Sequence, residues 1–136
     1  METINATFAR FEPLVHSIFR VITGLLMFQF GVAKLFKFPP VPMFAKVEPF
    51  SLFWFAGSIE LVLGGLLILG LFSRLAAFLL CGEMAIAYFM EHAPRNFIPL
   101  LNGGENAIMF CFACLYLTCA GGGLYSLDAA LRGKNG

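Results

Sequence analysis

The sequence predicts an all-α integral membrane protein, an antiparallel bundle of four transmembrane helices. Apolar residues make up 60% of the 136 residues and charged residues 12%, against about 45–50% and about 25% in soluble domains. A soluble domain of this size could not bury so much apolar surface. The apolar residues also gather in four stretches, each close to the roughly 20 residues that cross a bilayer. We therefore expect a single membrane domain over residues 1–136.

The first two spans are expected at about 13–36 and 51–71. The first is long and lacks a small-residue cleavage site, which indicates an uncleaved anchor rather than a signal peptide. The prolines of 38–42 cannot continue a helix. The loop that follows mixes phenylalanine with Lys46 and suits the membrane interface.

The third and fourth spans are expected at about 74–90 and 100–120. A tight turn at 70–73 makes the second and third helices antiparallel neighbours. Prolines bracket the third loop, Asn102 and two glycines precede the last helix, and three glycines end it. Helices are expected throughout, because an open sheet edge cannot lie in lipid.

An even number of spans places both termini on one side of the membrane. Basic residues set the orientation of such proteins, with the excess on the cytoplasmic side. The terminal side has a small excess, so we expect cytoplasmic termini. The basic residues counted are Arg10, Arg74, Arg132 and Lys134 on that side, and Lys37, Lys46 and Arg95 on the other.

Five ionisable side chains fall inside the expected spans, and each costs about 2.5–3.5 kcal/mol at mid-bilayer unless it is paired, neutral or wet. Depth along the helices, at about 1.5 Å per residue, predicts which of them can meet. Arg20 is expected to pair with Glu60 or Glu83, since both acids lie near mid-membrane. Lys34 is expected to pair with Glu105, nearer the opposite face.

Small residues accompany these charges at helical spacing. Gly24 and Gly31 share a face of the first span with Arg20 and Lys34, and Gly57 and Gly64 flank Glu60 on the second span. Such residues let a neighbouring backbone come close.

Two basic groups against three acidic ones leave one carboxylate over, and Glu83 is the candidate. A buried carboxylate without a partner is expected to hold a proton, because an isolated buried charge is unfavourable. Two interpretations stay open. In the first, the charges only fix the register of the helices. In the second, they form a polar pocket that binds a redox or carbonyl ligand or relays a proton.

The order of motifs along nearly the whole chain resembles the DoxX family. The motifs are Gly-Val-Ala-Lys-Leu at 31–35, Gly-Ser-Ile-Glu-Leu at 57–61, Leu-Gly-Leu-Phe-Ser-Arg at 69–74, Pro-Leu-Leu-Asn-Gly-Gly-Glu-Asn at 99–106 and Gly-Gly-Gly-Leu-Tyr-Ser-Leu-Asp at 121–128. The matching polar and glycine positions are Arg20, Gly31, Lys34, Glu60, Gly64, Arg74, Asn102, Gly103, Glu105 and Asp128. The resemblance implies a small, four-helix protein of the bacterial cytoplasmic (inner) membrane, associated with membrane redox complexes that include thiosulfate–quinone oxidoreductase and thiol-stress systems. It assigns no catalytic role to a residue.

Cysteines and histidines offer weaker signals. Cys111 and Cys114 have the C-x-x-C spacing of a dithiol centre, but they lie in an apolar helix, so inert packing is the favoured interpretation over a redox pair. His16 and His92 have no second ligand at metal spacing and fall at opposite faces. We therefore expect neither metal nor haem. Nucleic acid is not expected as a partner, because no basic patch is interleaved with aromatic residues.

Three functions remain in view. The first is an accessory subunit of a membrane redox complex, not catalytic alone, which contacts other oxidoreductase subunits. It has no assigned cofactor, and quinone is the candidate. The second is a small proton-coupled or small-molecule carrier or channel, suggested by the spare carboxylate. The third is a membrane scaffold or assembly factor. Glycine-rich and aromatic faces leave room for homo-oligomers, although no feature sets their number.

Overall fold

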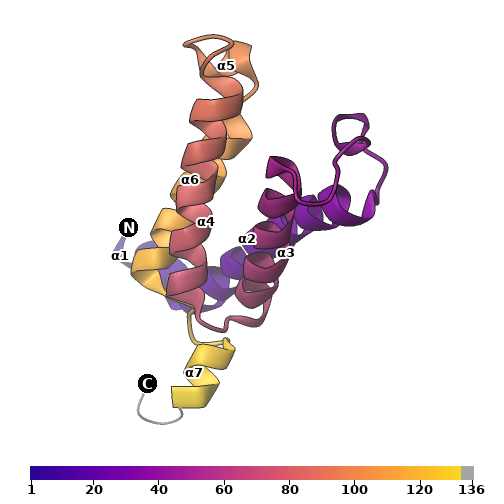
Figure 1. Ribbon diagram of the computed structural model, residues 1–136. Coiled ribbons are helices and arrows are strands. Elements are labelled where there is room, and N and C mark those ends of the chain that lie inside the picture. Colours follow the sequence, from indigo (N-terminus) through magenta and orange to yellow (C-terminus); the bar gives the residue numbers. More distant parts are fainter. Residues whose placement is uncertain (133–136) are drawn as a thin grey trace.

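The structure is a computed structural model that describes residues 1–132, and every regular element in that range is helical (Figure 1). Lys134, which entered the orientation argument, lies outside the described residues. In chain order the elements are α1 Glu2–Arg10, α2 Glu12–Phe36, η1 Pro42–Phe44, α3 Leu52–Leu69, α4 Ser73–Ala87, η2 Tyr88–His92, α5 Pro99–Asn102, α6 Glu105–Ala120 and α7 Leu127–Arg132.

Three helical stretches are long and apolar enough to cross a membrane. They are α2, α3 and the continuous stretch Ser73–His92, in which the π-turn η2 extends α4. Their outer faces carry exposed aliphatic and aromatic side chains such as Ile18, Val62 and Phe78. An apolar surface of this extent suits contact with lipid and would be a liability in water.

The fourth predicted span, 100–120, is interrupted. Its first residues form the single turn α5, the chain then turns at Gly103 with a positive φ of 72°, and α6 begins at Glu105. The 16 residues of α6 cover only about 24 Å at 1.5 Å per residue, less than the roughly 30 Å of a hydrocarbon core. A bundle of four full-length spans is therefore not confirmed.

The long helices form two antiparallel pairs, α2 with α3 and α4 with α6 (Figure 1). Figure 1 shows the pairs diverging from the short α3–α4 turn, so that α5 and the loop before α3 lie far apart. All four helices nevertheless contribute to one buried core. Its fully buried members include Met27 of α2, Leu67 of α3, Leu80 of α4 and Leu117 of α6.

The α2–α3 contact depends on glycine. A Cβ at Gly31 would lie 2.7 Å from the Gly57 carbonyl oxygen and 2.6 Å from the Leu61 nitrogen. A Cβ at Gly24 would lie 2.9 Å from the Gly64 carbonyl oxygen. These distances are too short for any real side chain, so the two backbones touch directly, as the small-residue pattern predicts.

Substitution of Gly31 by alanine is expected to destabilise the protein by about 1–3 kcal/mol, the usual cost of overpacking a tight contact. The matched control is Gly82→Ala, since a Cβ at Gly82 meets nothing within 4 Å. Thermal unfolding in a mild detergent measures both variants. Equal unfolding midpoints for Gly31→Ala and Gly82→Ala would contradict the close contact.

Candidate functional site

The central polar feature is an ion pair between α2 and α3. The Lys34 ammonium donates to both carboxylate oxygens of Glu60, at 2.8 and 3.0 Å. The side chains are only 10% and 2% exposed. Gly57 makes the room, because a Cβ there would lie 2.8 Å from the Lys34 Cβ. The close α2–α3 contact therefore places these two groups side by side.

Aromatic rings enclose the lysine side of this pair. The ammonium lies 5.4, 5.9 and 6.0 Å from the ring centroids of Phe44, Phe53 and Phe30, respectively. At about 6 Å or less a ring face attracts a cation, and the rings also exclude water. These phenylalanines were not among the residues predicted from the sequence. The abundance of phenylalanine in residues 38–50 could have pointed to them, because this loop places Phe44 of η1 over the ion pair.

Glu83 of α4 completes a cluster of three side chains from three helices. Its carboxyl group lies within electrostatic range of Glu60 and Lys34. Both of its oxygens are buried and have no hydrogen-bond partner. Two ionised carboxylates cannot hydrogen-bond to each other, because each only accepts. A single proton between Glu60 and Glu83 would supply the missing donor.

Both ion pairs that the sequence analysis predicted are wrong. Arg20 meets neither glutamate, and Lys34 binds Glu60 instead of Glu105. Glu105 lies exposed in the first turn of α6. The expected depths did not identify the partners: Glu60 lies beside Lys34, and Arg20 lies beside the last turn of α3.

Arg20 is almost fully buried, with 2% exposure, and binds backbone carbonyls. It donates to the Leu67 oxygen at 2.9 Å, to Ile68 at 3.5 Å, to Tyr125 at 3.2 Å and to Gly122. Leu67 and Ile68 belong to the last turn of α3, where carbonyls lack the regular helical partner four residues on. The Leu67 oxygen also accepts from the capping Gly70 N–H at 3.1 Å. A cation is favourable at that end because of the helix dipole. Arg20 thus ties α2 to the end of α3 and to the segment after α6.

Asp128 binds the backbone N–H groups at the start of α4. Its two carboxylate oxygens accept from the backbone N–H groups of Phe72 at 2.8 Å and Ser73 at 2.9 Å. Its own N–H donates to the Gly70 carbonyl at 2.8 Å. Burial alone would raise the pKa of Asp128, but the Ser73 and Phe72 hydrogen bonds and nearby Arg132 hold the pKa below its usual value. A carboxylate at a helix N-terminus is stabilised in the same way.

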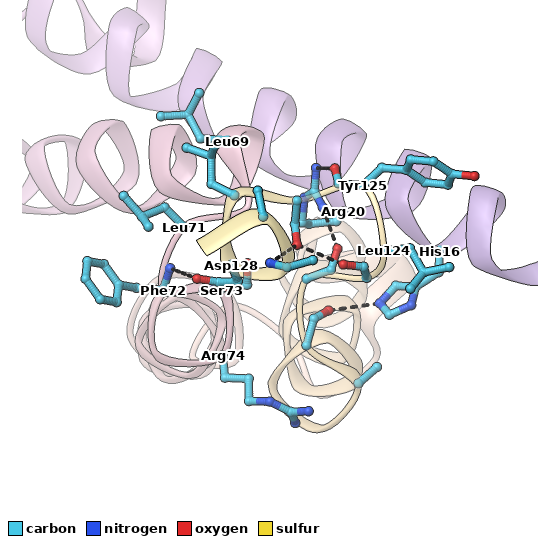
Figure 2. A pocket seen from close by; sticks show the side chains of 18 of the residues that line it. His16, Arg20, Leu69, Leu71, Phe72, Ser73, Arg74, Leu124, Tyr125 and Asp128 are labelled. Atoms are coloured by element: carbon cyan, nitrogen blue, oxygen red, sulfur yellow. Dashed lines mark hydrogen bonds between the residues drawn. The ribbon is translucent and has the colours of Figure 1, made fainter. Parts of the chain in front are cut away.

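These groups surround a groove of about 1660 Å³ between the start of α2, the α3–α4 turn and residues 120–132. Figure 2 shows Arg20 and Asp128 turned toward the chain's own backbone, while Leu69, Leu71 and Leu124 line the rest. His16 contacts the Gly121 carbonyl at 2.9 Å on the far wall. The Arg20 and Asp128 side chains are thus engaged within the protein, so the groove offers mainly an apolar wall.

Asn102 organises the turn between α5 and α6, at the end of the molecule opposite the groove (Figure 1). Its amide donates to the Tyr88 hydroxyl at 3.1 Å and to the Asn96 carbonyl at 2.9 Å, and accepts from the Gly104 N–H at 2.8 Å. The His92 ring contacts the Asn102 carbonyl at 3.1 Å. Asn102 is therefore engaged in shaping the α5–α6 turn.

The cysteines meet in a different pair from the one that the spacing suggested. All four are free, and the close contact is between Cys81 of α4 and Cys111 of α6, whose sulfurs lie 3.6 Å apart. Cys114 is fully buried in the core. Among residues 1–132, no three His, Cys, Asp or Glu side chains are grouped so that they could hold a metal ion.

Removing one partner of the buried pair is expected to cost about 3–5 kcal/mol, because the other charge is left uncompensated. Lys34→Met and Glu60→Leu should each lower the unfolding midpoint strongly, whereas the double variant should recover much of the loss. A double-mutant cycle in detergent measures the coupling. Glu105→Gln, at an exposed carboxylate, is the control and should change little. Additive single effects would contradict the pairing.

Acid is expected to weaken the Asp128 contact. Because the folded pKa is lowered, the carboxylate stabilises the protein above its unfolded pKa of about 3.9, and this stability is lost as pH falls through the folded pKa. Near neutral pH, Asp128→Asn should therefore lower the free energy of unfolding by about 1 kcal/mol, as loss of a helix cap does. In strong acid the substitution should have no effect. Unfolding midpoints of both proteins against pH measure the difference. A pH-independent difference would contradict the electrostatic origin.

Similarity to known proteins identifies the family of the chain. The DoxX family model matches residues 15–93, which contain nearly all of α2, the whole of α3 and α4, and all three residues of the Lys34–Glu60–Glu83 cluster. A protein of Haemophilus influenzae described as uncharacterized is 38% identical over 126 residues, which cover 88% of this chain and 92% of that protein. No solved structure matches. The chain belongs to the DoxX family.

Proposed function

We propose that this DoxX-family chain is an accessory subunit of a redox complex in the bacterial inner membrane, and that the Lys34–Glu60–Glu83 cluster is its proton-exchanging site. The observation that carries the proposal is Glu83, whose two buried oxygens lack a partner beside an intact ion pair. A group that holds a proton without being needed for the ion pair is able to release it when a neighbouring charge changes.

The charges of the cluster support proton exchange. One ammonium and two carboxylates carry a net charge of −1 when all are ionised, and zero when one proton is bound. Neutrality is favoured inside an apolar protein, since an unbalanced buried charge is costly. Electron transfer to a membrane quinone also consumes protons, so a site that exchanges one proton within the apolar layer suits a redox partner.

The surrounding helices support a position within the membrane. In this proposal α6, extended by α5, forms a fourth, shorter span, and the four long helices run alternately up and down. The start of α2, the α3–α4 turn and residues 121–132 lie at one end, with α5 and the loop before α3 at the other (Figure 1). We place the first of these ends, with both termini, in the cytoplasm.

A carrier that moves protons or small molecules is the second candidate, favoured by the same unpartnered carboxylate. A scaffold in which the cluster only fixes packing is the third. The three differ in what the Glu83 proton does. It responds to the redox state of the membrane in the first, it responds to an imposed pH gradient alone in the second, and it stays in place in the third.

Infrared difference spectroscopy on native membranes tests the proposal. We expect the carbonyl band of a protonated carboxyl group, which disappears in Glu83→Gln and persists in the exposed control Glu105→Gln. Reducing the membrane quinone pool should shift or bleach the band. A protonated carboxyl that ignores quinone reduction but follows a pH gradient would favour the carrier, and a band that follows neither would favour the scaffold. Absence of the band would overturn the proton site itself.

A further inference from the structure

Two thiols from different helices meet between α4 and α6. The sulfurs of Cys81 on α4 and Cys111 on α6 lie 3.6 Å apart, which is van der Waals contact, and both side chains are partly exposed. They are far apart in sequence, so only the α4–α6 pairing brings them together. Cys114 is fully buried, and Cys119 is exposed near the end of α6.

We propose that Cys81 and Cys111 form a reversible disulfide that ties α4 to α6, and that the oxidant is a lipid-soluble organic hydroperoxide. A disulfide bond is about 2.0 Å long, so the two sulfurs, now 3.6 Å apart, must approach by only about 1.6 Å. Side-chain rotation and a slight shift of two partly exposed side chains supply such a movement. The spacing of Cys111 and Cys114 along one helix produces no comparable contact.

The oxidant follows from the location of the thiols. Both cysteines lie in the interior of apolar helices, with an exposed face of aliphatic and aromatic side chains around them, such as Phe78 and Phe112. A reagent that reaches them must therefore dissolve in the acyl chains. Fatty acyl hydroperoxides meet that requirement.

The chemistry is balanced without a further co-reactant. One thiol sulfur attacks the terminal peroxide oxygen, the O–O bond breaks, and the thiol proton passes to the leaving alkoxide, which departs as an alcohol. The sulfur is then a sulfenic acid. The second thiol attacks this sulfur, the S–O bond breaks, and water leaves with the second thiol proton. Two thiols are oxidised to one disulfide, and one hydroperoxide is reduced to alcohol and water.

The bond would restrain the stretch of α4 that carries Glu83. Cys81 precedes Glu83 by two residues on α4, so a link to α6 fixes the part of α4 that carries the unpartnered carboxyl group. The disulfide does not depend on the proton-exchange proposal, since it follows from the sulfur contact alone.

The test uses the full chain in its membrane. Membranes are incubated with cumene hydroperoxide over hours, the time scale of uncatalysed thiol chemistry. The protein is then denatured, alkylated with N-ethylmaleimide and weighed intact. The four free cysteines should all be labelled before oxidation, and two should be lost from labelling afterwards, with full recovery after dithiothreitol. Peptide mapping should show Cys81 joined to Cys111 within one chain.

Four variants decide the assignment. Cys81→Ala and Cys111→Ala should each abolish the paired loss of labelling, so that a folding defect in one variant leaves the other informative. Cys114→Ala and Cys119→Ala are matched controls and should still lose two labels. Full labelling of the wild type after oxidation would overturn the proposal, as would a bond to Cys114, a bond between two chains, or paired loss that persists in Cys81→Ala.

Discussion

The direct backbone contact between α2 and α3 is the constraint on which the rest of the structure depends. At Gly24, Gly31 and Gly64 a single added carbon would collide with the facing helix. The close approach lets the Lys34 ammonium reach both oxygens of Glu60. A wider separation would leave two charges buried without partners, at a cost of several kcal/mol each. Glycine is therefore as necessary to the ion pair as the charged residues are.

The chain neutralises its buried charges in two physically different ways. Arg20 is satisfied by carbonyl dipoles at the end of α3 and in the segment after α6. A planar guanidinium with five donors suits such a set of acceptors. Lys34, a compact cation, is satisfied by a carboxylate and by the faces of aromatic rings. Because Arg20 binds carbonyl oxygens and no carboxylate, Glu83 has no cation of its own and remains without a partner.

The α4–α6 pair joins the α2–α3 pair through polar contacts at one end. Arg20 of α2 donates to the Gly122 and Tyr125 carbonyls after α6, and the Asp128 N–H donates to the Gly70 carbonyl at the end of α3. The Asp128 carboxylate also caps the start of α4. Helix ends require such partners because their last carbonyls and first N–H groups have none within the helix. The segment 121–128 supplies many of them, so it links all four long helices. The groove beside it has an apolar wall because the Arg20 and Asp128 side chains bind backbone groups of the protein itself.

The sequence by itself determined the membrane class, the family, the approximate boundaries of α2, α3 and α4, and the glycine contact between α2 and α3. These follow from local composition and from helical spacing, which a single chain displays directly. It did not determine which charges pair, the break at Gly103, the Cys81–Cys111 contact or the cap by Asp128. Spacing gives the depth of a side chain and its face on its own helix. Only the tertiary structure decides which face meets which neighbour, because that depends on the rotation and crossing of helices distant in sequence.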